Sequence, residues 1–158
     1  MDSQTVSQED IQHFVGKNRD YYLRTWTHLA QPSKIIKWNW AAFLLGPIWL
    51  AYRKELWPAL AITLVYLLAE YFEQAELDLV LSLAFGLFGN YYYLNQAAKK
   101  IMRTKAQNVE SEVQQEAIAK LGGTSAIGVL IMIVVLILFS TGTINGHEVS
   151  LLQSLFPR

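Results

Sequence analysis

The chain has 158 residues, which is enough for one domain or one small membrane module. Its thirteen Lys and Arg balance thirteen Asp and Glu, so net charge points to no class of partner. Charged residues make up only 16% of the chain and hydrophobic residues 53%, against about 25% charged residues in soluble domains. Cysteine is absent, which excludes disulfides, thiolate metal sites and cysteine nucleophiles. Because the apolar residues fall into long blocks, we predict an all-α membrane protein.

Residues 1–37 are predicted to form a cytoplasmic amphipathic part. Apolar residues recur with a period near 3.6 from position 7 to position 30, which indicates one amphipathic helix. Ser7 and Asp10 have the spacing of a capping box, Gly16 weakens the helix, and Pro32 ends it. The apolar face is expected either to pack on the rest of the cytoplasmic part or to lie on anionic headgroups or a partner.

Residues 38–54 form an aromatic segment that is too short for an ordinary span. About thirteen apolar positions fall short of the ~20 residues that cross a bilayer, and Gly46-Pro47 interrupts them. Its candidate membrane-interface residues are of the aromatic and basic types that gather at headgroup depth. They are Trp38, Trp40, Trp49, Tyr52, Arg53 and Lys54. We expect either a re-entrant hairpin or a flat interfacial helix, because unpaired backbone cannot face lipid.

Residues 55–95 are predicted to form a two-span hairpin with an acidic link. The first span runs from Trp57 to Phe72 and the second from about Leu77 to Asn95. Three tyrosines near the end of the second span are predicted to lie at the interface: Tyr91, Tyr92 and Tyr93. Small or polar residues of the second span are predicted to let helix backbones approach closely: Ser82, Gly86, Gly89 and Asn90. Packing within the chain and self-association into a homo-oligomer are both open.

The remaining chain is predicted to be a linker, a span and a tail. Residues 96–123 have a charged helical pattern whose apolar stripe includes Val113 and Leu121, and this stripe is expected to pack on the N-terminal helix. Gly122-Gly123 ends that helix, and Thr124 or Ser125 caps the next one. Residues 124–142 are the predicted third span, and residues 143–158 are a predicted extracytoplasmic tail.

The distribution of basic residues decides between the two paths of the aromatic segment. Cytoplasmic loops collect Lys and Arg near the ends of membrane spans. If residues 38–54 enter and return, twelve of the thirteen Lys and Arg lie on one side and only Arg158 on the other. If the segment crosses, the two sides hold six and seven. The sequence therefore predicts three spans, a cytoplasmic N-terminus and an extracytoplasmic C-terminus.

Several aromatic and glycine motifs resemble one bacterial membrane family. The residues that carry the resemblance are Phe14 to Asn18, Asp20 to Tyr22, Trp38 to Phe43, Gly46 to Trp49, Tyr52 to Lys54, Gly89 to Tyr93, and Gly122 to Ser125. Together they cover roughly residues 11–125, and the family they resemble is domain of unknown function 2628. The resemblance implies a bacterial origin, the cytoplasmic (inner) membrane and a helical part facing the cytoplasm. It implies no activity.

The sequence offers little chemistry for an enzyme. Its three histidines are far apart, and no metal-ligand spacing, phosphate loop, serine elbow or nucleic-acid motif is present. We therefore expect no catalytic, metal or cofactor site. Polar residues inside spans are functional candidates, and here Asn39, Glu70 and Asn90 stand out. Two hypotheses follow. One is a structural or adaptor protein that presents cytoplasmic helices to a protein partner or to anionic lipid. The alternative is a subunit of an oligomeric transporter or channel.

Overall fold

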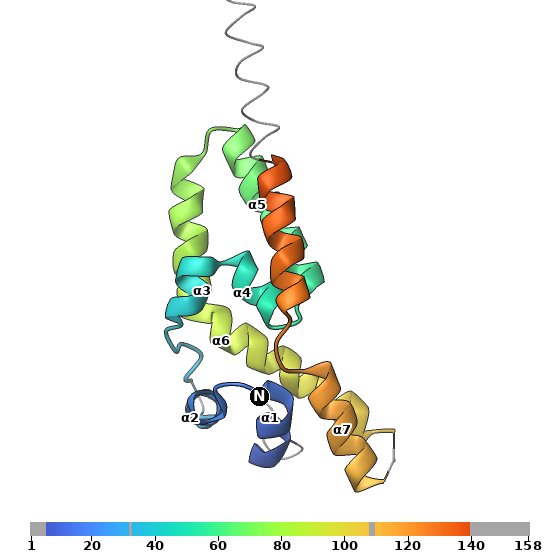
Figure 1. Ribbon diagram of the computed structural model, residues 1–158. Coiled ribbons are helices and arrows are strands. Elements are labelled where there is room, and N and C mark those ends of the chain that lie inside the picture. Colours follow the sequence, from blue (N-terminus) through green and yellow to red (C-terminus); the bar gives the residue numbers. More distant parts are fainter. Residues whose placement is uncertain (1–5, 32, 108–109, 140–158) are drawn as a thin grey trace, which may run out of the picture.

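The computed structural model describes residues 6–31, 33–107 and 110–139, and all regular elements in these ranges are helices (Figure 1). In chain order they are α1 (Gln8–Val15), α2 (Arg19–Leu29), α3 (Trp40–Leu45), α4 (Pro47–Tyr52), α5 (Leu56–Tyr71), α6 (Ala75–Lys105), α7 (Ser111–Leu121) and a helix over residues 126–139. The prediction of an all-helical chain is confirmed for this part. The last residues of the predicted third span and the predicted tail lie outside the described residues.

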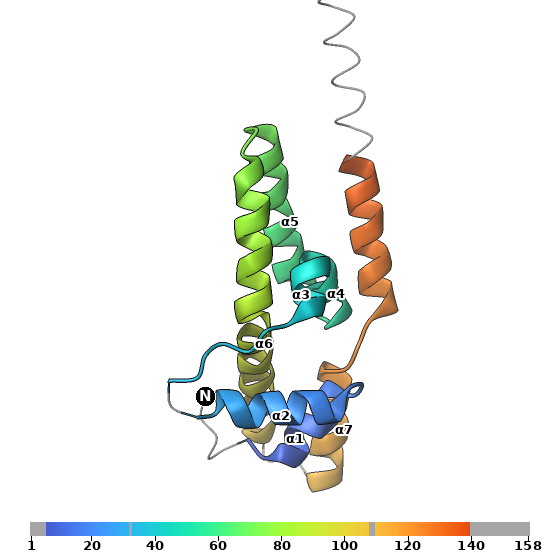
Figure 2. The same ribbon diagram turned by 90° about the vertical axis from the view of Figure 1, so that its left-hand side faces the viewer.

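The lower part of the molecule is a small helical base, which consists of α1, α2, α7 and residues 91–105 of α6 (Figure 2). Its core is built from apolar and aromatic side chains of all four elements, including Phe14, Trp26, Ile101 and Ile118. The predicted capping box is present at the start of α1, because Asp10 N–H donates to Ser7 Oγ and Ser7 N–H to the Asp10 carboxylate. α7 packs on α1.

The single helix expected over residues 7–30 is wrong, because the chain forms two helices there. Gly16 and Asn18 both have positive φ, of 67° and 62°, which ends α1 and turns the chain into α2. The break leaves the Phe14 carbonyl open to the Gly122-Gly123 turn, and Gly123 N–H donates to it at 2.6 Å. A Cβ on Gly122 would lie 1.9 Å from the same oxygen. The Gly122-Gly123 turn, which ends α7 as predicted, is therefore also in close backbone contact with the end of α1.

α6 is one continuous helix of 31 residues that joins the upper part of the molecule to the base. The predicted second span and the start of the predicted linker are thus a single rigid element. The helical pattern expected over residues 96–121 is divided, because α6 ends at Lys105 and α7 begins at Ser111. On α7 the buried residue is Ile118, whereas Val113 and Leu121 of the predicted stripe are exposed.

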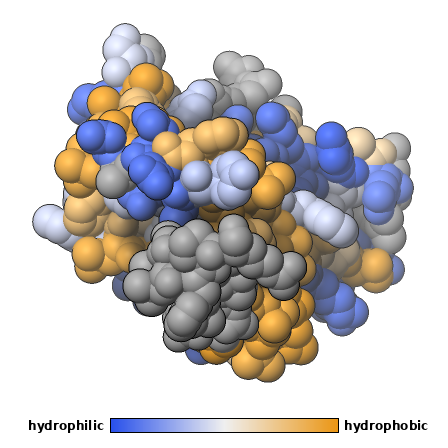
Figure 3. Space-filling view, turned by 90° about the horizontal axis from the view of Figure 1, so that it is seen from above, coloured by the Kyte–Doolittle hydropathy of each residue, from blue (hydrophilic) through white to orange (hydrophobic). Residues whose placement is uncertain are grey.

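Two stretches are long and apolar enough to cross a membrane, Glu76–Lys105 and Ser111–Phe139, and α5 is a shorter apolar helix. The apolar residues of the second stretch belong to the 126–139 helix, since the chain turns at Gly122-Gly123. Ser125 caps this helix, because Gly128 N–H donates to Ser125 Oγ at 2.9 Å. Seen from above, hydrophobic surface reaches the outline on the left and at the bottom, while hydrophilic surface lies on the right and at the upper left (Figure 3).

Residues 38–54 form a bent pair of short helices, α3 and α4, which we call the aromatic hairpin. The turn is at Gly46, whose φ of 45° and ψ of −119° favour glycine, and Pro47 begins α4. Both ends of the hairpin contact α6, Asn39 at Gly86 and Glu55, just after α4, at Lys100. Between them, Gly46 lies near the Tyr66 hydroxyl on α5. The hairpin therefore rises toward the middle of α5 and returns toward the base.

Candidate functional site

The two asparagines singled out from the sequence contact each other, although 51 positions separate them. Asn39 Nδ2 donates to Asn90 Oδ1 at 3.0 Å, and Asn90 Nδ2 donates to the Tyr21 hydroxyl at 2.7 Å and the Lys37 carbonyl at 3.1 Å. Asn39 Oδ1 accepts from the N–H of Ala42, which caps α3. Both asparagines are buried. We call this hydrogen-bond group the asparagine clasp, because it joins α2, the hairpin and α6.

The small residues of α6 are also used in contacts within the chain. A Cβ on Gly86 would lie 2.7 Å from the Trp38 ring, and one on Gly89 would lie 2.9 Å from the Ala42 Cβ. One turn earlier, Ser82 Oγ is 3.5 Å from the Tyr66 hydroxyl on α5. These close approaches allow the aromatic hairpin to lie directly on the α6 backbone.

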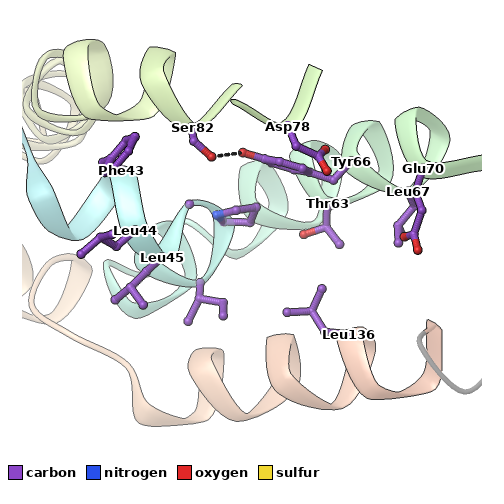
Figure 4. Close-up of a pocket in the computed structure, with 13 residues that line it drawn as sticks. Phe43, Leu44, Leu45, Thr63, Tyr66, Leu67, Glu70, Asp78, Ser82 and Leu136 are labelled. Atoms are coloured by element: carbon purple, nitrogen blue, oxygen red, sulfur yellow. Dashed lines mark hydrogen bonds between the residues drawn. The ribbon is translucent and has the colours of Figure 1, made fainter. Parts of the chain in front are cut away.

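Glu70 lies away from the clasp, on the wall of a cavity of about 290 Å³ between the hairpin, α5, α6 and the 126–139 helix (Figure 4). We call it the hairpin cavity. Polar groups on its α5 and α6 walls include the hydroxyls of Thr63, Tyr66 and Ser82 and the carboxylates of Glu70 and Asp78. The hairpin contributes apolar side chains. This lining can hydrogen-bond a small polar or cationic solute.

Arg53 differs from its expected place at a membrane interface, because its side chain is buried inside the protein and only 2% exposed. Its guanidinium carbon lies 4.4 Å from the Tyr22 ring centre and 5.4 Å from those of Tyr52 and Tyr93. Nη1 donates to the Val15 carbonyl at 3.4 Å. Such a site is stabilised by cation–π attraction, which strengthens when water is excluded.

Tyr22 does not neutralise the charge of Arg53. Burial raises the pKa of Tyr22 to about 12, although the neighbouring guanidinium opposes that rise. The phenol therefore stays protonated at physiological pH. Within the described residues no carboxylate forms an ion pair with Arg53, since the four salt bridges found there join other groups. Arg53 is thus a buried cation held by tyrosine rings and the Val15 carbonyl, with no carboxylate partner among the described residues.

The other predicted interface residues divide into buried and exposed sets. Trp49 and Tyr93 are core residues whose rings lie 5.9 Å apart, while Tyr52, Tyr91, Tyr92 and Trp38 are half-buried. Trp40 is 66% exposed on the side of α3. Lys54 is exposed and donates from Nζ to the Lys120 carbonyl at 2.8 Å, which ties the end of the hairpin to α7.

Two ion pairs at the lower end of α6 were missed by reasoning from the sequence. Lys100 Nζ lies 2.6 Å from Glu55 Oε1, and Lys105 Nζ lies 2.8 Å from Asp10 Oδ2. Burial raises the pKa of Asp10, but the hydrogen bonds from Lys105 and Ser7 outweigh it, so that this pKa is below its ordinary value. The sequence signal for these pairs is weak: Lys100 and Lys105 lie on one helix, and their partners Glu55 and Asp10 are far from them along the chain.

Comparison of the chain with protein-family models, with curated proteins and with solved structures found no match. The resemblance to domain of unknown function 2628 stays a prediction. The described residues contain no group of three or more His, Cys, Asp or Glu side chains placed to hold a metal ion.

Proposed function

We propose that the chain is an integral protein of the bacterial cytoplasmic membrane that acts as a structural adaptor. In this proposal α5, residues 75–95 of α6 and the 126–139 helix cross the bilayer, and the aromatic hairpin enters and leaves from the cytoplasmic side. The helical base then lies in the cytoplasm and presents its surface to a protein partner or to anionic headgroups.

The observation that carries the proposal is the exposure of large apolar side chains on the upper helices. In the apolar 18-residue windows of the two stretches, only 28% and 17% of the residues are buried inside the protein, whereas a core helix of a soluble protein is mostly buried. Exposed examples occur on each upper helix, such as Leu64, Leu79, and Leu130. Contiguous apolar surface of this kind requires lipid or protein around it.

The base supports the adaptor role through its charge. Six exposed basic side chains on the base or in the segment that leads from it to the hairpin form no ion pair among the described residues: Lys17, Arg19, Arg24, Lys34, Lys99 and Arg103. The apolar core of the base is shared by α1, α2, α6 and α7 and continues into the hairpin, so the exposed outer surface of the base is left for other molecules. Basic residues beside a membrane attract anionic headgroups at about 1 kcal/mol each near the surface.

Photo-crosslinking in intact cells tests the proposal. A photoreactive residue in place of Arg24 reports on the base, and one in place of Leu64 is the matched control on the apolar surface. We expect a discrete protein or anionic-lipid adduct from the Arg24 position and bulk-lipid adducts from the Leu64 position. Bulk-lipid adducts alone at both positions, or water quenching at both, would contradict the adaptor role.

The alternative, a transporter or channel subunit, is supported by the hairpin cavity. Its hydroxyls and the Glu70 carboxylate form a polar surface beside apolar helices. Flux of small cations in proteoliposomes, lowered by Glu70→Gln and unaffected by Glu73→Gln, is the expected result for this function. Flux that is absent or equal in all three proteins counts against it.

A further inference from the structure

Arg53 and Trp38 line a second cavity, of about 480 Å³, at the junction of the base and the aromatic hairpin. We call it the Arg53 cavity. Its walls come from α2, from the aromatic hairpin and from Val129 on the 126–139 helix. The volume is within the roughly 300–1,000 Å³ of small-molecule sites. The lining is mainly aromatic and apolar, and it contains no Asp or Glu.

Two buried nitrogen atoms of the lining residues have no hydrogen-bond partner within the described part of the chain. They are Arg53 Nε and Trp38 Nε1. Both groups are donors only, so the groups that would satisfy them are acceptors. The tyrosine rings around Arg53 attract its charge, but Nε itself has no hydrogen-bond partner among the described residues. A buried guanidinium without a paired anion is unfavourable, and the positive field of Arg53 in this cavity is not offset by any lining carboxylate.

We propose that the Arg53 cavity binds the phosphate headgroup of an anionic glycerophospholipid. The inference rests on the proposed topology, which puts the junction of base and hairpin at the depth of the cytoplasmic headgroups. Two apolar side chains of the lining, Leu45 and Trp40, are 50% and 66% exposed and give the acyl chains a surface to follow. A free phosphate ion gains nothing from these side chains, which favours the lipid as the source of the phosphate.

Native mass spectrometry of the delipidated full chain in detergent tests the inference. The additions are dioleoylphosphatidylglycerol, dioleoylphosphatidylcholine, dioleoylglycerol and inorganic phosphate, each at the same concentration. We expect one molecule of phosphatidylglycerol to bind with clear preference. Arg53→Gln should weaken that binding roughly tenfold or more, because a charge-assisted hydrogen bond is lost. The matched control Lys120→Gln removes an exposed cation of α7 that is paired with Glu116, and it should bind as the unmodified chain does.

A second variant keeps the test decisive if Arg53→Gln does not fold. Ala41 is exposed and lines the cavity, so Ala41→Phe narrows the cavity without changing any buried charge. Loss of phosphatidylglycerol in Ala41→Phe, with unchanged helical circular dichroism, supports the site. Equal binding of phosphatidylglycerol and phosphatidylcholine, or unchanged binding in both variants, overturns it. Binding of inorganic phosphate without preference for the lipid overturns the lipid as the source. Resistance of the chain to alkaline extraction from membranes separately reports whether the proposed membrane integration holds.

Discussion

Replacing Asn90 with alanine should release the aromatic hairpin from α6. The side chain is fully buried and makes three good hydrogen bonds, at 2.7, 3.0 and 3.1 Å. At about 0.6 kcal/mol each, the mean for bonds inside membrane proteins, their loss costs about 2 kcal/mol. If Asn39 Nδ2 is then left without an acceptor, a further 1–3 kcal/mol is expected. We therefore predict a destabilisation of about 2–5 kcal/mol.

The assay is thermal unfolding in detergent, followed by circular dichroism and tryptophan fluorescence. A loss of about 2–5 kcal/mol corresponds to a fall in Tm of roughly 4–20 °C for a chain of this size. Asn95→Ala is the matched control, because Asn95 lies on the same helix, is half-buried and takes part in no side-chain hydrogen bond among the described residues. A fall for Asn90→Ala no larger than for Asn95→Ala would refute the clasp, as would additive effects of Asn39→Ala and Asn90→Ala.

Three further changes test the contacts of the base. Glu55→Ala should cost about 2 kcal/mol in chemical unfolding, because Lys100 loses its partner at a site that is only partly open to water; an unchanged midpoint would contradict this. Gly122→Ala should cost about 3 kcal/mol, since the new Cβ would lie 1.9 Å from the Phe14 carbonyl oxygen; unaltered protease resistance of the base would count against that packing. The lowered pKa of Asp10 means that its contribution to stability is present above the ordinary value of 3.8 and is lost as pH falls below it. Below pH 3.8 the free energy of unfolding should therefore fall less steeply with pH in Asp10→Asn than in the unmodified chain. Equal slopes in the two proteins would contradict this.

Local signals in the sequence predict the helices well where the decisive contacts are between near neighbours. Ser7 and Asp10 form the expected capping box, and the Gly122-Gly123 turn and Ser125 end one helix and start the next as expected. Each of these features is decided within one helical turn, so the pattern of residue types is enough to predict it.

Features that depend on distant partners could not be predicted in this way. The sequence predicts only a weak point at Gly16, whereas the structure ends α1 there with a positive φ and places the Gly122-Gly123 turn, more than a hundred positions later, against it. Arg53 was expected to reach toward headgroups, because a basic residue after an apolar block usually does so. Its burial follows from Tyr22 and Tyr93, which come from two other helices. The contact between Asn39 and Asn90 likewise needed the fold.

The path of the aromatic hairpin through the bilayer is tested most directly by labelling single cysteines. The chain has no native cysteine, so each introduced thiol is read without background. The four positions are exposed: Gln31→Cys before the hairpin, Lys54→Cys after it, Gln74→Cys between α5 and α6, and Glu110→Cys before α7. A membrane-impermeant maleimide is added to intact spheroplasts and to inverted membrane vesicles. We predict labelling at 31, 54 and 110 only in inverted vesicles and at 74 only in spheroplasts. Labelling at 54 in spheroplasts would mean that the aromatic segment crosses the membrane, and the proposed topology would be wrong.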